Sequence, residues 1–191
     1  MGVSSDGKVF IARRTVRPGW TVDLDVYGND EGLPIGTLSM PSLTRDILTD
    51  DNGMVYVSHA ERTEADPRVP AGLTVIRSGD LQTVAKIEFQ QYYFYQLALG
   101  PDGLLYGAVG RRLAAGDIES GGNAKMENTG LLVAMDLDRQ RVVDELPVPT
   151  GPYALMITPE GKAYILHRHP TQGSEPSQVS VYDLKERKLL K

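Results

Sequence analysis

Two histidines near the end of the chain, His167 and His169, are the residues whose types and spacing first suggest chemistry. On one β-strand their side chains would share a face, roughly 6.6 Å apart along the chain. That separation suits two ligands of one metal ion, but a third ligand must come from elsewhere. The sequence holds three histidines and no cysteine, and no carboxylate stands at ligand spacing beside this pair. We therefore predict no tightly bound transition metal.

Stretches related to the one that precedes His167 recur three times upstream. The four stretches are SSDGKVFIA, DDNGMVYVS, GPDGLLYGA and TPEGKAYIL, and their glycines are Gly7, Gly53, Gly103 and Gly161. The glycines are 46, 50 and 58 residues apart. Asp-Gly or Asn-Gly between two apolar runs predicts a β-hairpin with a type I′ turn, in which both central residues have positive φ. Glu160 departs from this preference, so the fourth turn is open to another type.

A second pair of apolar runs follows each hairpin. Spacings of 49, 59 and 47 residues separate its aligned positions, which are Tyr27, Ile76, Met135 and Tyr182. Each unit of about 50 residues thus holds four short β-like runs with little helical periodicity, which is typical of β-propeller blades. We predict an all-β propeller of four consecutive four-stranded antiparallel blades. It forms one domain over 1–191, with repeat units at about 2–38, 39–89, 90–147 and 148–191.

The last repeat, GPYALMITPEGKAYILHR with SQVSVYDLKERKLL, resembles the repeat of YVTN-type, lactonase-like bacterial β-propellers. GPDGLLYGA and VAMDLDRQRVV match the same pattern, so the resemblance covers nearly the whole chain. It implies a propeller fold and a secreted or periplasmic location. It carries no catalytic residue over to a numbered position, because such propellers serve as enzymes, cofactor holders and binding scaffolds.

The first and last units are shorter than the others. Three residues, GVS, precede the first turn sequence, whereas RDILTD precedes the second, and the last unit stops at Lys191 just inside its fourth strand. The resemblance implies about seven blades. Three arrangements remain open: a compact four-bladed ring, part of a longer propeller, or an eight-bladed ring made with another copy, since exposed end blades would leave apolar faces bare. We favour the partial propeller, with the dimer second.

Candidate binding residues follow from counting along each unit. Strand A starts eight residues before the turn glycine, and strand B ends six residues after it, on the same face of a propeller. The first positions are Arg45, Tyr95 and Tyr153, and the second are Arg13, His59, Val109 and His167. Tyr93 lies beside them in FQQYYFYQ, where alternation must send neighbouring aromatics to opposite faces. We predict a ligand site built from Arg45, Tyr93, Tyr95, Tyr153, His59 and His167.

His167 thus has a counterpart in His59, so it fills a repeated position. The repetition favours a polar strand end near solvent over a metal ligand.

Composition argues against several function classes. A net charge of −5 gives no basic excess for nucleic acid, no apolar run predicts a membrane span, and no cofactor is indicated. Tyrosine and arginine side chains suit a polar small molecule with a ring or carboxylate, or a peptide. We predict a non-catalytic binding or scaffold propeller. The alternative, implied by the resemblance, is a metal-assisted lyase or hydrolase of the streptogramin-lyase-like or lactonase-like kind, acting on the same face.

Overall fold

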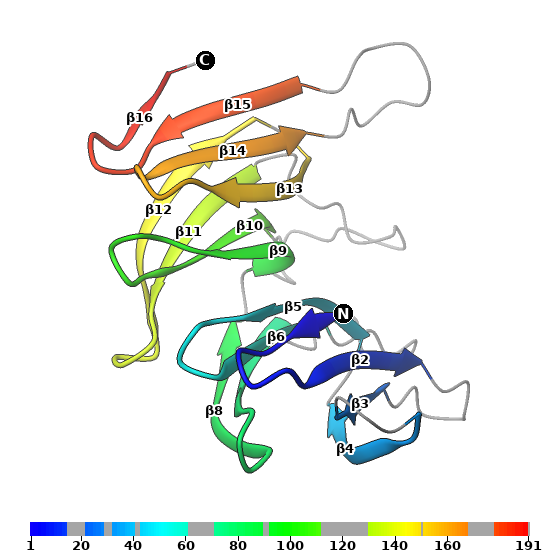
Figure 1. Cartoon of the computed structure of the whole chain (residues 1–191). Helices are drawn as coiled ribbons and strands as arrows, with labels where there is room; N and C mark the ends of the chain where they lie inside the picture. Colours follow the sequence, from blue (N-terminus) through cyan, green and yellow to red (C-terminus); the bar gives the residue numbers. More distant parts are fainter. Residues whose placement is uncertain are drawn as a thin grey trace, which may run out of the picture. The chain divides into compact units, whose positions relative to one another are not determined.

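The computed structural model describes residues 1–14, 22–28, 32–40, 43–60, 71–89, 92–111, 130–149, 151–167 and 178–190. These residues form strands and turns but no helix, and therefore no helical membrane span. The strands make four four-stranded antiparallel sheets, which confirms the predicted all-β architecture (Figure 1). The chain divides into two compact units, Met1–Gln90 and Gln91–Lys191, and each unit holds two sheets.

The strands of every sheet follow one another in chain order, and we call them A to D. Sheet one consists of β1 (Gly2–Val3), β2 (Val9–Arg14), β3 (Val22–Tyr27) and β4 (Pro34–Met40). Sheet two consists of β5 (Leu43–Thr49), β6 (Met54–Ala60), β7 (Ala71–Arg77) and β8 (Gln82–Phe89). Sheet three consists of β9 (Tyr92–Leu99), β10 (Leu105–Arg111), β11 (Gly130–Asp136) and β12 (Arg141–Val148). Sheet four consists of β13 (Pro152–Ile157), β14 (Lys162–His167), β15 (Gln178–Asp183) and β16 (Lys188–Leu189).

The four A–B turns share one geometry, and it is not the predicted one. The glycine N–H donates to the carbonyl three residues earlier, at 2.9–3.3 Å, and the φ angles of Gly7, Gly53, Gly103 and Gly161 are 82°, 76°, 80° and 79°. The residues before these glycines do not have positive φ. The type I′ prediction is therefore wrong, because a three-residue loop with one left-handed glycine also accepts Asp-Gly. The turn at Glu160 is not an exception.

Alanine substitutions at Gly103 and Gly79 distinguish the effect of backbone strain from the effect of steric clash. A Cβ atom added at either glycine meets no heavy atom within 4 Å, yet only Gly103 has a positive φ. We expect Gly103→Ala to lower the free energy of unfolding by about 1 kcal/mol, because an L side chain strains the left-handed region. Gly79→Ala should be neutral or slightly stabilising. Urea denaturation measures both, and equal effects would contradict this account of the turn.

The central B–C pairs run in unbroken register, whereas the longer edge strands carry β-bulges. The extra residues on the A strands are Arg45, Tyr95 and Tyr153. Those on the D strands are Ile35, Val84 and Val143, which are exposed. A bulge residue has no paired residue on the neighbouring strand and interrupts the two-residue alternation of side chains. Faces therefore cannot be assigned by simple alternation along A and D.

Each unit buries an apolar core between its two sheets. We call the side of a sheet that holds the third and fifth residues after the turn glycine its forward face, and the opposite side its backward face. In the first unit the forward face of sheet one packs on the backward face of sheet two through Phe10, Leu24, Val26, Ile47, Val55, Val57 and Ile76. In the second unit sheets three and four do the same through Tyr106, Ala108, Leu132, Ala134, Leu155, Ala163, Ile165 and Tyr182.

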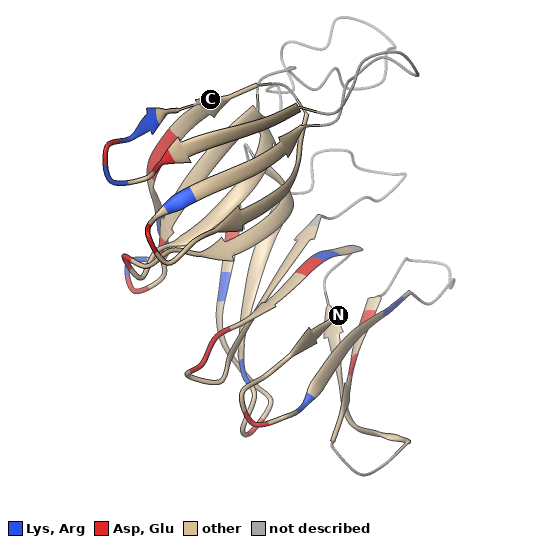
Figure 2. Ribbon diagram, turned by 45° about the horizontal axis from the view of Figure 1, so that its top comes forward, with Lys and Arg blue, Asp and Glu red and all other residues tan. Residues whose placement is uncertain are grey.

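Charged side chains gather at the turns, as Figure 2 shows. Asp50 accepts hydrogen bonds from the backbone N–H of Met54 at 2.7 Å and from the Tyr56 hydroxyl at 3.0 Å. Asp102 accepts one from the Tyr106 hydroxyl at 2.7 Å. Burial, followed by the hydrogen bond to the carboxylate, raises the pKa of both tyrosines above the ordinary value. These carboxylates therefore tie the A–B turn to strand B.

Candidate functional site

The three predicted A-strand residues occupy one structural position. Arg45, Tyr95 and Tyr153 are the extra residues of the A-strand bulges in sheets two, three and four. Arg45 is exposed, Tyr95 is half-buried, and Tyr153 is 55% exposed. A bulge re-aims the side chain it inserts, and bulges are over-represented at functional sites. The structure therefore gives these three residues a shared geometry that counting alone did not reveal.

The aromatic stretch on β9 divides into buried and half-buried rings, although the bulge at Tyr95 interrupts strict alternation. Tyr92 and Phe94 are buried, whereas Tyr93 and Tyr95 are half-buried. The rings of Tyr93 and Tyr95 meet edge to face, with centroids 5.2 Å apart and an interplanar angle of 65°. This is a favourable arrangement of two aromatic rings. The second unit therefore brings two of the predicted site residues into contact.

Both predicted histidines are buried, so the expectation of a strand end near solvent is wrong. His59 is 7% exposed and His167 is 4% exposed. His59 lies opposite Gly72, and a Cβ atom added to that glycine would stand 2.3 Å from Cε1 of the imidazole. The ring therefore occupies the space that a side chain at position 72 would need. Gly72 was the sequence signal for this burial.

His59 is a neutral side chain with an incompletely satisfied ring. Its Nε2 lies 3.3 Å from the Thr74 hydroxyl, and burial, aided by the charge of Lys86, lowers the pKa of His59 to about 4. Among the described residues, neither His59 Nδ1 nor the buried Thr44 hydroxyl has a hydrogen-bond partner. Thr44 lies opposite His59 and next to Arg45. This end of sheet two therefore holds two buried polar atoms that no other described residue hydrogen-bonds.

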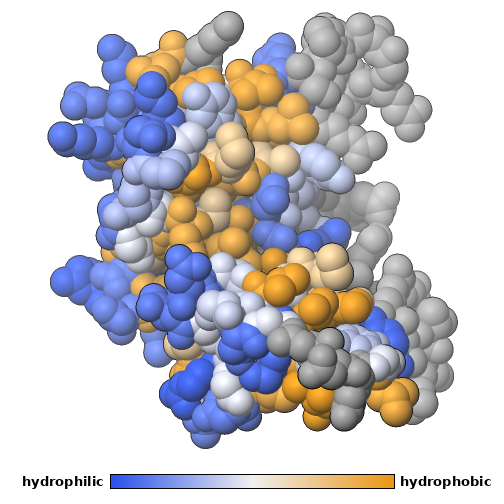
Figure 3. Space-filling model, in the orientation of Figure 1, coloured by the Kyte–Doolittle hydropathy of each residue, from blue (hydrophilic) through white to orange (hydrophobic). Residues whose placement is uncertain are grey.

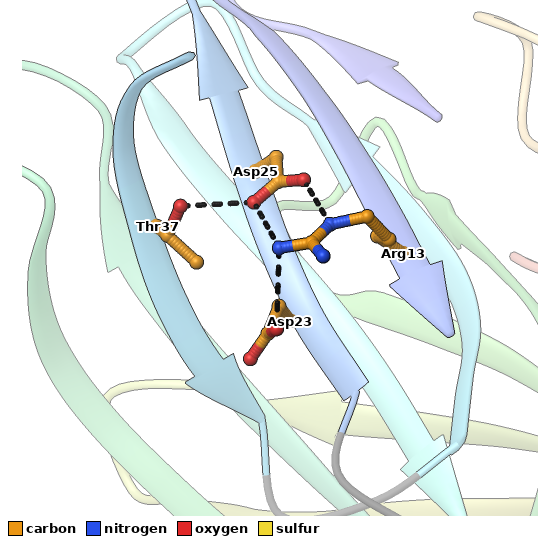
Figure 4. Close-up of polar contacts among 4 residues, drawn as sticks. All are labelled: Arg13, Asp23, Asp25 and Thr37. Carbon is orange, nitrogen blue, oxygen red and sulfur yellow. Dashed lines mark hydrogen bonds and ion pairs between the residues drawn. The ribbon is translucent and has the colours of Figure 1, made fainter. Parts of the chain in front are cut away.

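In sheet one the position of His59 is taken by Arg13, which anchors an ionic network (Figure 4). Arg13 Nε donates to Asp25 Oδ2 at 2.6 Å, and its Nη2 donates to Asp23 Oδ2 at 3.3 Å. The Thr37 hydroxyl donates to Asp25 Oδ1 at 2.9 Å. The hydrogen bonds from Arg13 and then from Thr37 lower the pKa of the buried Asp25. Sequence reasoning found Arg13 but missed Asp25, although the alternating run VDLD places Asp23 and Asp25 on one face.

In sheets one and two, the residue six after the turn glycine contacts a residue on strand C diagonally. These pairs are Arg13 and Asp25 in sheet one and His59 and Thr74 in sheet two. Sheet three has Val109 and Val133 at these positions, and sheet four has His167 and Ser180, all of them buried. His167 therefore belongs to a structural repeat.

The second histidine of the opening pair, His169, lies outside the described residues. Within the described ranges, no group of three or more His, Cys, Asp or Glu side chains could hold a metal ion.

The backbone beside two bulges is satisfied by side chains that sequence reasoning did not single out. Next to Arg45, the N–H of Asp46 donates to the Ser58 hydroxyl at 3.1 Å. Next to Tyr95, the side-chain oxygen of Gln96 accepts from the N–H of Leu155 at 2.8 Å and so links the A strands of sheets three and four. Ser58 and Gln96 could have been identified from the sequence by looking for polar residues near the bulge positions.

No family model and no curated protein matches this sequence. Solved structures do resemble it, beginning with hydrazine synthase from Kuenenia stuttgartiensis, with a TM-score of 0.66 and 17% identity over 97% of this chain and 50% of that one. The propeller of Dos1 matches with a TM-score of 0.60 and 13% identity over 96% of this chain and 44% of that one. An oligogalacturonate lyase in complex with manganese matches with a TM-score of 0.59 and 12% identity over 98% and 50%.

These likenesses define the class of the fold. The chain has a β-propeller architecture and spans about half the length of the structures it matches.

Proposed function

We propose that this chain is a non-catalytic binding propeller of the YVTN-like class. It contacts its ligand at the end of each sheet where strand A begins and strand B ends. The single observation that carries the proposal is the recurrent A-strand bulge, which presents Arg45, Tyr95 and Tyr153 from one position in three successive sheets. A purely structural bulge would not need a large polar or aromatic side chain each time.

The residues around the bulges indicate the chemistry of the ligand. In the second unit, the half-buried Tyr93 and Tyr95 offer ring faces and hydroxyl groups. In the first unit, Arg45 offers a planar cation beside polar atoms of Thr44 and His59 that have no hydrogen-bond partner among the described residues. Such groups suit a polar small molecule with an aromatic ring or a carboxylate, or a peptide segment that carries both.

The alternative, a metal-assisted lyase or hydrolase, has weaker support. One structural neighbour is a lyase in complex with manganese, but a likeness at 12% identity concerns the fold alone. Within the described part of this chain, the polar residues at the B-strand ends include two diagonal pairs, Arg13–Asp25 and His59–Thr74, and no metal-binding group.

The proposal is tested by ligand-observed NMR with aromatic carboxylates and short acidic peptides that contain one aromatic residue. For any binder found, we expect Tyr153→Ala to raise the dissociation constant at least about tenfold, as loss of an aromatic anchor does. Tyr153→Phe separates the ring from the hydroxyl. Val84→Ala, at the exposed D-strand bulge of sheet two, is the control and should bind as the wild type does. Equal affinity for wild type and Tyr153→Ala would overturn the assignment of this residue to the site.

A further inference from the structure

Gln96 lies between the A strands of sheets three and four. It follows the bulge residue Tyr95 directly and stands opposite Ala108, so its side chain is on the forward face of sheet three. Its Oε1 accepts a hydrogen bond from the backbone N–H of Leu155 at 2.8 Å. Leu155 comes two residues after the bulge residue Tyr153 and belongs to the core between the two sheets. The Gln96 amide is therefore close to both bulge residues of the second unit.

The hydrogen bond to Leu155 determines which way the Gln96 amide is turned. A backbone N–H is a donor, so it can pair only with the oxygen of a side-chain amide. β13 is an edge strand of sheet four, and no further strand of that sheet is available to this N–H. The Nε2 amino group of Gln96, which carries two N–H donors, is consequently turned away from Leu155.

The Nε2 amino group is available to a ligand. Within the described part of the chain it makes no hydrogen bond, and it is not fully buried. Gln96 as a whole is half-buried, and Figure 3 shows polar and apolar residues side by side over β9 and β13. An acceptor from outside can therefore reach the amino group while the amide oxygen stays bound to Leu155. An amide already held by its oxygen loses little further freedom on binding.

The backbone on both sides of Tyr153 is held in place. Pro152 is buried directly before it, and a Cβ atom added to Gly130 on strand C of sheet three would stand 2.7 Å from Cδ of Pro152. The start of β13 therefore lies against sheet three. After the bulge, the side chain of Gln96 holds the backbone of Leu155. Tyr153 thus stands between two anchored backbone positions, as expected of a largely preformed binding site.

The corresponding position of sheet two has the opposite chemistry. Asp46 and Gln96 both lie seven residues before the turn glycine of their sheet, and each follows a bulge residue. An ionised Asp46 has acceptor oxygens only, and its Oδ1 accepts from the N–H of Ile47 at 3.0 Å. Gln96 instead places N–H donors beside the tyrosine rings of β9. The second unit can therefore donate to a ligand acceptor next to its aromatic side chains.

We propose that Gln96 is a specificity-determining residue of the binding site, and that its Nε2 amino group donates to the carboxylate of a small aromatic acid whose ring contacts Tyr95 and Tyr153. This inference rests on the proposed function and narrows its ligand class. A carboxylate offers acceptor atoms only, which matches an amide that has only donors left. A hydrogen bond to a charged acceptor is also stronger than one to a neutral acceptor. The site therefore prefers the acid to its neutral amide.

Ligand-observed NMR at neutral pH with phenylacetate and its neutral analogue phenylacetamide tests the proposal. Wild type should bind phenylacetate more tightly. Gln96→Glu keeps an oxygen for the N–H of Leu155 but sets a second carboxylate against the ligand, so the ratio of affinities, acid over amide, should fall at least about tenfold. Gln140→Glu adds the same charge at the exposed C–D turn of sheet three and should keep the wild-type ratio.

Two outcomes would overturn the inference: an unchanged ratio in Gln96→Glu, or no binding of phenylacetate by wild type. The proposed function fails separately, if Tyr153→Ala leaves the affinity of every binder unchanged.

Protein-observed NMR tests the contact in the wild-type chain, without any substitution in the bound protein. The side-chain amide signals of Gln96, identified by their loss in Gln96→Glu, should shift when phenylacetate is added. Those of Gln140 should stay in place. Binding of phenylacetate that leaves the Gln96 amide signals unmoved would refute a direct contact. Circular dichroism of each variant should keep the wild-type β-sheet spectrum.

Discussion

Phe94→Ala is expected to lower the free energy of unfolding by about 3–5 kcal/mol, as aromatic truncations in protein cores do. Phe94 is 1% exposed, and its ring lies against Gly107 on the neighbouring strand. A Cβ atom at that glycine would stand 2.7 Å from Cε1 of Phe94. Truncation would leave a cavity that the glycine cannot fill. Thermal and urea denaturation measure the loss.

Tyr153→Ala is the control for the loss of unfolding free energy expected for Phe94→Ala. Tyr153 is an exposed bulge residue, so its truncation should change the free energy of unfolding by less than about 1 kcal/mol. A loss as large as that of Phe94→Ala would place Tyr153 in the core and leave its proposed binding role without support.

Stability should fall as the pH is lowered from 6.5 towards 4, and His59 is the cause. Its pKa is lowered from 6.5 to about 4 in the folded chain, chiefly by burial. Between these values the unfolded chain binds the proton and the folded chain does not, so the free energy of unfolding rises with pH across this window. The contribution of His59 is complete above pH 6.5 and is lost at about pH 4. Its full size is about 3 kcal/mol.

Sheet three supplies the control for this pH dependence. It holds Val109 and Val133 where sheet two holds His59 and Thr74. The double variant His59→Val/Thr74→Val copies that apolar pair and should lose the slope of stability between pH 6.5 and 4. Urea unfolding at several pH values, with wild type and variant side by side, gives the comparison. An unchanged slope in the double variant would show that another group is responsible.

The four sheets could be predicted because turn chemistry and strand alternation are local properties of a sequence. Glycines such as Gly53 and Gly103, with the strand C markers, were sufficient to locate every hairpin. The type of turn could not be predicted, because Asp-Gly fits two hairpin loops that differ in the conformation of the residue before glycine.

The shared repeat position of three candidate residues could be predicted, but their bulge geometry could not. Counting from a glycine placed Arg45, Tyr95 and Tyr153 at one point of the repeat. Whether a residue forms a bulge depends on the register between its strand and the next one, and this register cannot be read from the type of the residue. In the same way, the burial of His59 depends on Gly72 across the B–C pair, and the partner of Arg13 depends on how β2 and β3 align.

The bulges also bear on how the chain avoids aggregation. A flat strand edge with unpaired N–H and C=O groups can template the strand of another molecule. Strands A and D are the two edges of every sheet here. Each edge strand of six residues or more carries an inserted residue, and β1 and β16, which carry none, are two residues long. A foreign strand cannot match a register that breaks partway, so the bulged A and D strands are poor templates for edge-to-edge growth.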